Sequence, residues 1–254
     1  MKQIIVNKVT SGYANEVYQI KHHELIWYLK LFKNLKNYYR EIEAIKQLKT
    51  LKLACPEVIF KQPRMVIFRG NGKPISICEE SVKELSFLLA HQHSLTLHRN
   101  SIPLLDFDPQ PNRILQRLKN LYGYEPYKLA LVHGDITPEN LVRDSNGLYY
   151  LIDWEEATIS DPIIDLSIAI IEFFAMEKSF KESKYLCLLF ETTYFNFLKD
   201  HLIESVYSSM PFKYFLYMAC LEELQSWAIT HNKRVLAQQY STILEEKWIQ
   251  QILY

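Results

Sequence analysis

The stretch from Leu131 to Leu166 reads LVHGDITPENLVRDSNGLYYLIDWEEATISDPIIDL. It holds two carboxylates and an amide at fixed spacing, Asp135, Asn140 and Asp153. The run Asp144 to Gly147 lies between two apolar segments and is a strong turn signal. The pattern predicts a loop that carries the first two of these polar residues, followed by a β-hairpin that ends at Asp153.

This order of loop, hairpin and second aspartate is typical of kinase-type phosphoryl transfer. In such sites the first aspartate orients an attacking hydroxyl and accepts its proton. The asparagine and the later aspartate hold magnesium on ATP, and oxygen ligands suit that metal. The alternative is that the three polar residues cap turns in an ordinary α/β protein. An aspartate at the end of an apolar strand, following Asp-x-x-x-x-Asn and a tight hairpin, favours the kinase interpretation.

The segment resembles the signature of the aminoglycoside phosphotransferase and choline kinase family, which are small-molecule kinases with a protein-kinase-like fold. The positions that match are His133, Gly134, Asp135, Asn140, Asp153 and Asp165. Gly134 stands where most eukaryotic protein kinases have arginine, and no Ala-Pro-Glu follows Asp153, which counts against a protein kinase.

The resemblance implies an α+β, bilobal protein-kinase-like fold. We expect residues 1–72 to form a nucleotide-binding lobe and hinge, with a small antiparallel sheet and one helix. Residues 73–254 are expected to form a larger, mainly helical lobe for catalysis and acceptor binding.

Composition and charge are those of a globular chain. Of the 254 residues, 48% are hydrophobic, and 29 basic side chains balance 29 acidic ones, so net charge points to no nucleic-acid partner. The four cysteines are scattered singly, and no apolar run without charges is long enough to span a bilayer. We expect a cytoplasmic protein with reduced thiols and no membrane partner, as a monomer or weak dimer.

Lys30 lies in a strongly apolar run from Trp27 to Phe32. Taken alone it is as well explained as a solubilising charge on an edge strand. Helical spacing over residues 39–48 places Glu41 on the same face as apolar residues, and a carboxylate turned toward the sheet needs a cationic partner. By the resemblance, Lys30 and Glu41 form the pair that aligns the α- and β-phosphates of ATP.

The turn between the first two predicted strands contains Gly12 and Asn15. The pattern Gly12-x-x-Asn15-x-x-Tyr18 is similar to the nucleotide loop of choline-kinase-type members of the family. Ala14 departs from the hydroxyl residue often found there, so backbone amides are the expected phosphate contacts. The resemblance thus adds Gly12 and Asn15 to the nucleotide site.

Two further residues concern the support of the loop, His133 and Asp165. By the resemblance, His133 is a structural residue of the catalytic loop. Asp165 either caps the helix that follows it or accepts hydrogen bonds from the loop, and the two roles are compatible. His93 is predicted on the apolar side of a helix, with no spacing typical of a metal pair.

The acceptor is less well defined by the sequence. Family members act on aminoglycosides, choline, ethanolamine, thiamine and other small alcohols, and many of these are cations. A cation favours carboxylates and aromatic faces, and Glu155, Glu222 and Trp227 are candidates. Solvated glutamates and a core tryptophan are the alternative for the last two.

Together these features predict a magnesium- and ATP-dependent kinase that transfers the γ-phosphate to a hydroxyl of a small cationic alcohol, of thiamine or choline type. Asp135 is expected to hold the acceptor hydroxyl and to have an ordinary low pKa, since this reaction depends mainly on positioning. An aminoglycoside O-phosphotransferase is the alternative. A nucleotide-binding pseudokinase is a third, but it would be expected to have lost Lys30, Asp135, Asn140 or Asp153.

Overall fold

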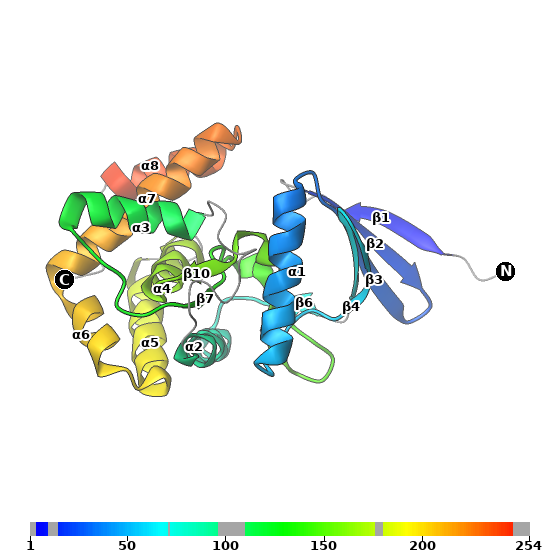
Figure 1. Ribbon diagram of the computed structural model, residues 1–254, viewed down its shortest axis with the longest axis horizontal. Coiled ribbons are helices and arrows are strands. Elements are labelled where there is room, and N and C mark those ends of the chain that lie inside the picture. Colours follow the sequence, from blue (N-terminus) through cyan, green and yellow to red (C-terminus); the bar gives the residue numbers. More distant parts are fainter. Residues whose placement is uncertain (1–3, 10–14, 71, 96–109, 176–179, 246–254) are drawn as a thin grey trace.

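The computed structural model describes residues 4–9, 15–70, 72–95, 110–175 and 180–245. The first part of the chain forms an antiparallel sheet with one long helix beside it, and the rest is mainly helical (Figure 1). This mixed α+β architecture confirms the predicted fold class. Gly12, which the resemblance assigns to the nucleotide site, lies outside the described residues.

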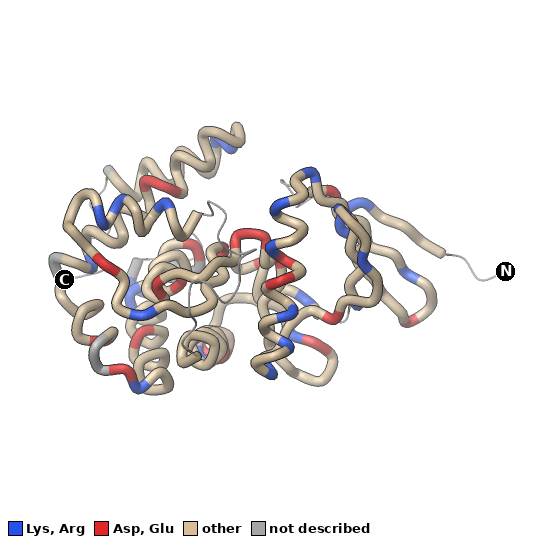
Figure 2. Tube along the Cα trace, viewed as in Figure 1, with Lys and Arg blue, Asp and Glu red and all other residues tan. Residues whose placement is uncertain are grey.

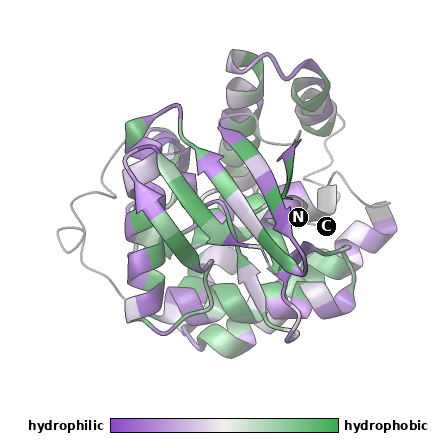
Figure 3. Cartoon of the chain, turned by 90° about the vertical axis from the view of Figure 1, so that its right-hand side faces the viewer, coloured by the Kyte–Doolittle hydropathy of each residue, from purple (hydrophilic) through white to green (hydrophobic). Residues whose placement is uncertain are grey.

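The N-terminal sheet has five antiparallel strands in the order β1-β2-β3-β5-β4. Their bounds are β1 Ile5–Val9, β2 Glu16–His22, β3 Leu25–Leu31, β4 Val58–Gln62 and β5 Met65–Arg69. Helix α1 (Leu35–Thr50) covers one face, and Figure 3 shows the opposite face, where hydrophilic and hydrophobic colours mix along the strands. Such mixing is what a sheet with one covered face and one exposed face requires.

Strand β3 is the central strand, and this decides the environment of Lys30. In the sheet register Lys30 lies opposite Val17 on β2 and Val66 on β5, and only 6% of its surface is exposed. A lysine in the middle of a sheet is not a solubilising edge charge. The edge-strand alternative is therefore wrong for this residue.

Seven helices account for most of the described remainder of the chain. They are α2 Glu79–Ser94, α3 Gln110–Tyr122, α4 Ile163–Ala169, α5 Phe180–Leu198, α6 His201–Ser208, α7 Met210–Thr230 and α8 Arg234–Glu245. Helix α4 continues as a π-helix over Ile170–Ala175. The main hydrophobic core lies among these helices and also includes the inner side chains of α1.

Two small sheets carry the signature stretch. Strand β7 (Ala130–Val132) pairs with β10 (Thr158–Ser160), and β8 (Leu141–Arg143) pairs with β9 (Tyr149–Leu151) and β6 (Lys73–Pro74). The hairpin predicted around Asp144 is thus present. The pair of β7 with β10 was not expected, because three-residue strands leave too short a pattern in the sequence.

Among the described helices, none combines the length and apolar character needed to cross a bilayer. All four cysteines are free thiols.

Candidate active site

The loop after β7 carries Asp135 and Asn140. A short 3-10 turn, Pro138–Asn140, brings the asparagine side chain back to the aspartate. Its Nδ2 donates to the carbonyl oxygen and to Oδ2 of Asp135, at 3.0 Å in each case. Because the amide nitrogen is used in this way, the amide oxygen of Asn140 is the atom left to face a cation.

The β8–β9 hairpin delivers Asp153 next to this loop. The backbone N–H of Ile152 donates to the carbonyl of Asn140 over 2.9 Å, which joins the end of the hairpin to its beginning. Asp153 then adopts a left-handed backbone conformation, φ 64° and ψ 61°. That conformation costs an L-residue about 1–2 kcal/mol, so the surrounding structure must hold it.

A buried cluster around Asp165 supports the loop that carries Asp135. The Asp165 cluster, as we call it, consists of Asp165, His93, Tyr194 and the backbone amides of residues 133 and 134. Helix α4 begins at Ile163, so Asp165 lies within its first turn and is not the N-cap. Its carboxylate, fully buried, accepts from the backbone N–H groups of His133 and Gly134, each over 2.8 Å.

His93 from α2 completes the Asp165 cluster. Its Nε2 lies 3.2 Å from the Asp165 carboxylate and its Nδ1 lies 2.9 Å from the Tyr194 hydroxyl of α5. Since a carboxylate accepts, Nε2 carries the proton and Nδ1 accepts from the tyrosine. The sequence pattern predicts an apolar helix face for His93 but indicates no role for it in the site.

His133 links the loop to the hairpin. Its Nε2 donates to the carbonyl of Ile152 over 2.9 Å, and its Nδ1 accepts from the backbone N–H of Asp135 over 3.2 Å. The ring packs edge-on against Trp154, with 4.4 Å between ring centroids. Burial lowers the pKa of His133, so the neutral ring that this geometry requires is the stable form.

Gly134 is required by both conformation and space. Its φ is +83°, and a Cβ at this position would lie 2.7 Å from Cγ of Pro111 and 2.8 Å from the carbonyl oxygen of Glu156. No larger side chain fits there without a shift of the start of α3 or of the segment after β9. This explains why glycine occupies the position directly before Asp135.

A second cluster joins the sheet, α1 and the segment after β9, and we call Lys30, Asn15, Glu41, Asp153 and Glu155 the Lys30 cluster. The Lys30 Nζ lies 2.7 Å from Oε2 of Glu41 and 3.7 Å from Oε2 of Glu155, and it also contacts Oδ1 of Asp153. The Asn15 side chain donates to Glu155. Figure 2 shows acidic residues on the segment beside α1.

The Lys30 cluster contains more negative than positive charge. Burial lowers the pKa of Lys30, but Asp153, Glu41 and Glu155 outweigh burial and raise it well above its usual value. Burial raises the pKa of Glu41 to about 7, although Lys30 opposes this increase. The pKa of Glu155 is also raised, mainly by burial and next by the negative charge of Asp153. One lysine therefore does not neutralise three carboxylates.

Asp135 is affected by the same excess of charge. Burial, then the neighbouring Asp153, raises its pKa well above the usual range. The expectation of an ordinary low pKa is therefore wrong for the chain without ligands. A divalent cation beside Asp153 would reverse this effect.

The donors around Asp135 fit magnesium. Asn140 and Asp153 offer an amide and a carboxylate oxygen, which are ligands that magnesium prefers. Within the described residues no group of three His, Cys, Asp or Glu side chains is arranged to hold a metal by itself. At phosphate sites magnesium usually takes only one or two protein ligands and completes its shell with phosphate and water.

The candidate acceptor residues are separated in the structure. Glu155 lies in the Lys30 cluster, whereas Glu222 on α7 pairs with Arg117 of α3, with 3.2 Å between Oε2 and Nη1. Trp227 stacks on His231, with 4.6 Å between ring centroids. None of the contacts recorded among the described residues connects Glu222 or Trp227 to Asp135.

Glu172 is a residue of this region that the sequence reading did not single out. It lies in the π-helix after α4, is 9% exposed, and accepts a hydrogen bond from the Tyr240 hydroxyl of α8. Its negative charge contributes to the raised pKa of Asp135. The available signal was a carboxylate within the apolar run from Ile168 to Ala175.

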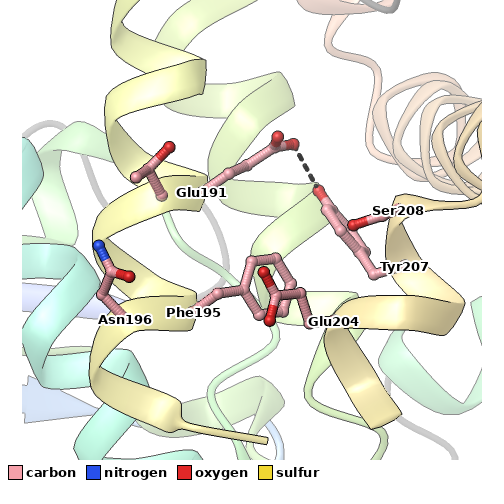
Figure 4. A pocket seen from close by; sticks show the side chains of 7 residues that line it. Glu191, Phe195, Asn196, Glu204, Tyr207 and Ser208 are labelled. Carbon is pink, nitrogen blue, oxygen red and sulfur yellow. Dashed lines mark hydrogen bonds between the residues drawn. The ribbon is translucent and has the colours of Figure 1, made fainter. Parts of the chain in front are cut away.

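A separate cavity of about 190 Å³ lies between α5 and α6 (Figure 4). It is lined by Glu191, Thr192, Phe195, Asn196, Glu204, Tyr207 and Ser208. Glu191 accepts from the Tyr207 hydroxyl over 3.0 Å and pairs with Lys213. This cavity includes none of the residues of the two clusters or of the loop that carries Asp135.

Comparison with known proteins agrees with this geometry. Residues 81–183 match the phosphotransferase enzyme family, APH. A search of curated protein sequences gave no match.

Solved structures share the fold over nearly the whole chain. An ethanolamine kinase of Plasmodium vivax is similar at 15% identity and a TM-score of 0.65, over 94% of this chain and 81% of that one. The choline kinase LicA of Streptococcus pneumoniae is similar at 14% identity and a TM-score of 0.64, over 98% and 93% of the two chains.

A third solved structure is the streptomycin–ATP–APH(2″)-IIa ternary complex, at 16% identity and a TM-score of 0.58, over 89% of this chain and 84% of that one. At these identities the likeness shows the fold alone. The family match over residues 81–183 and the shared fold make this chain similar to the small-molecule phosphotransferases of the aminoglycoside phosphotransferase and choline kinase family.

Proposed function

We propose that this chain transfers the γ-phosphate of ATP, with magnesium, to a hydroxyl of a small cationic alcohol of choline or thiamine type. The similar APH(2″)-IIa complex contains ATP, which supports the choice of nucleotide. Lys30, held by Glu41, binds the α- and β-phosphates, and Gly12 and Asn15 belong to the loop over them. Asn140 and Asp153 hold magnesium, which neutralises charge on the phosphates when it is bound.

In this proposal Asp135 accepts a hydrogen bond from the acceptor hydroxyl and takes its proton as the phosphate is transferred. Asn140 fixes Asp135 by donating from Nδ2 to its Oδ2 and to its backbone carbonyl, each over 3.0 Å. His133 accepts from the backbone N–H of Asp135, and Asp165 accepts from those of the two preceding residues, so the backbone that leads to Asp135 is fixed.

Glu172 is the observation that supports a cationic acceptor. It is a buried carboxylate whose charge acts on Asp135, and no Lys, Arg or His among the described residues pairs with it. Burial raises its pKa to about 7, which means that the ionised form lacks a counter-charge. A cationic group of the acceptor would provide that charge, while its hydroxyl reaches Asp135.

The test is an ATP-consumption assay with magnesium against choline, ethanolamine, thiamine, several aminoglycosides and neutral alcohols. The unchanged chain is compared with Asp135→Asn and Glu172→Gln. We expect turnover with one monocationic alcohol, and Asp135→Asn to lower kcat about 10²–10⁴-fold. Glu172→Gln should raise the KM of that alcohol at least ~30-fold, because removing one partner of a buried charge pair costs about 2 kcal/mol or more.

The pH dependence gives a second readout. A carboxylate with a pKa of about 7 becomes ionised as the pH rises through that value, so the KM of a cationic acceptor should fall over the same range. In Glu172→Gln this dependence should disappear. Equal turnover of neutral and cationic alcohols, or a KM that ignores Glu172→Gln, would overturn the cationic acceptor. An aminoglycoside as the sole acceptor would favour the alternative kinase.

A further inference from the structure

Two consecutive side chains of helix α1 have different buried partners. Glu41 pairs with Lys30 of β3, and the preceding residue, Arg40, is 4% exposed and points to the segment after β9. Its Nη1 donates to the backbone carbonyl of Glu155 over 2.5 Å and lies 3.7 Å from Oε2 of Glu156. The sequence reading assigned Arg40 no role.

The contacts of Arg40 extend to a third element. The Glu156 carboxylate that faces Arg40 also accepts from the backbone N–H of Gln110, the first residue of α3, over 2.9 Å. Residues 154–156 form a 3-10 turn that directly follows Asp153. Arg40 therefore connects the N-terminal helix, the turn after Asp153 and the start of α3.

A guanidinium that donates to a backbone carbonyl does more than neutralise charge, because it fixes where the backbone lies. This matters here because Asp153 is held in a left-handed conformation that its neighbours must maintain. The carbonyl that Arg40 binds belongs to the second residue after Asp153. Without that bond, the turn would be free to relax and Asp153 would leave the position it has beside Asn140 and Lys30.

We propose that Arg40 is a positioning residue, which holds the turn after Asp153 so that the Asp153 carboxylate is placed to bind magnesium together with the nucleotide. The inference rests on the proposed function, since it takes Asp153 as a magnesium ligand. It assigns Arg40 no contact with ATP or with the acceptor. Its effect should therefore appear in the magnesium dependence of nucleotide binding.

The experiment is calorimetric titration of the full chain with a non-hydrolysable ATP analogue, at a series of magnesium concentrations and with no magnesium. The variants are Arg40→Gln and Arg40→Lys. The matched control is Lys46→Gln, which removes one positive charge from the exposed side of the same helix. Circular dichroism and thermal melting verify that each variant is folded.

We expect Arg40→Gln to weaken magnesium-dependent binding about 10–100-fold, as is usual for residues that orient metal ligands. Binding without magnesium and the behaviour of Lys46→Gln should match the unchanged chain. Arg40→Lys keeps the charge but loses the forked geometry of the guanidinium, so its magnesium-dependent affinity should lie between those of Arg40→Gln and the unchanged chain. If Arg40→Gln does not fold, the comparison of Arg40→Lys with Lys46→Gln carries the test.

Two results would overturn the inference. If Arg40→Gln and Arg40→Lys bind the magnesium–nucleotide complex as the control does, or weaken binding equally with and without magnesium, Arg40 has no positioning role toward the metal. If the unchanged chain itself shows no magnesium-dependent binding, the proposed function fails as well. The two failures are therefore distinguishable.

Discussion

The Asp165 cluster holds the backbone just before Asp135, and the Lys30 cluster includes Asp153 and Glu155 after β9. The two clusters are built differently. In the Asp165 cluster each carboxylate oxygen accepts from a backbone N–H, and His93 adds a third donor. In the Lys30 cluster one ammonium group faces three carboxylates, and the side chain of Asp153 is 37% exposed. The first cluster has its donors and acceptors matched within the protein, and the second has not.

This difference suits the Asp165 cluster to structural support and the Lys30 cluster to ligand binding. A buried carboxylate with three donors is stable without any ligand, so it can hold a loop in one conformation. A cluster with excess negative charge gains stability when a cation enters. The loop that carries Asp135 is thus preorganised by contacts within the protein, whereas the Lys30 cluster has excess negative charge that a bound cation would neutralise.

The strongest test of the comparison is Asp165→Ala. It leaves two buried backbone N–H groups and one imidazole nitrogen without an acceptor, and each costs about 1–3 kcal/mol, so we expect a loss of about 3 kcal/mol or more in the free energy of unfolding. Asp144→Ala is the control, because Asp144 also accepts from two backbone N–H groups, but in an exposed turn. Urea denaturation measures both, and equal losses would contradict the assignment.

Ligand addition should act through the other cluster. Magnesium with a non-hydrolysable ATP analogue, at a hundred times its Kd, should stabilise the chain by about 2.7 kcal/mol. Asp153→Asn should remove most of this gain, because it removes the charged ligand of the metal. Thermal melting with and without magnesium measures the effect. The same stabilisation in Asp153→Asn would show that the cluster is not completed by a cation.

Two glycines with the same φ offer a third test. Gly134 and Gly147 both have φ +83°, so an alanine carries similar backbone strain at each. At Gly134 the new Cβ meets Pro111 and a backbone carbonyl, whereas at Gly147 the nearest atom is a side-chain nitrogen 3.5 Å away. We expect Gly134→Ala to cost at least ~1 kcal/mol more than Gly147→Ala by denaturation, through overpacking. Equal costs would mean that the start of α3 shifts freely.

The smallest effect should come from Glu155→Gln. Because the pKa of Glu155 is raised, its ionised form is less favourable in the folded chain than in the unfolded chain. We therefore expect the free energy of unfolding of this variant, at pH 7 and without ligands, to equal that of the unchanged chain or to exceed it by at most ~1 kcal/mol. The gain should shrink toward pH 4 as Glu155 takes up a proton. A loss like that of Asp165→Ala would erase the distinction between the clusters.

Local patterns were sufficient for much of this arrangement. The turn at residues 144–147 and the apolar runs beside it predict the β8–β9 hairpin, because a hairpin depends on neighbours in sequence. The helical spacing of Glu41 predicts that it faces the sheet, and it meets Lys30 at 2.7 Å. These features need no knowledge of distant contacts.

Other features depend on contacts between distant segments, and local patterns do not contain them. His93 and Asp165 are 72 positions apart, Arg40 and Glu155 are 115 apart, and Glu172 and Tyr240 are 68 apart. The strand pair of β7 and β10 is too short for periodicity to reveal. For the same reason, nothing local indicated that Glu222 would pair with Arg117.

The bond from Tyr240 to Glu172 has an evolutionary consequence. Tyr240 belongs to α8, a helix that packs on α7, whereas Lys30, Asp135, Asn140 and Asp153 lie on other elements. Substitutions within the α7–α8 hairpin therefore alter the surroundings of Glu172 while those four residues stay as they are. Under the proposed function, selection for new acceptors, in nature or in a laboratory library, would act on this helical hairpin.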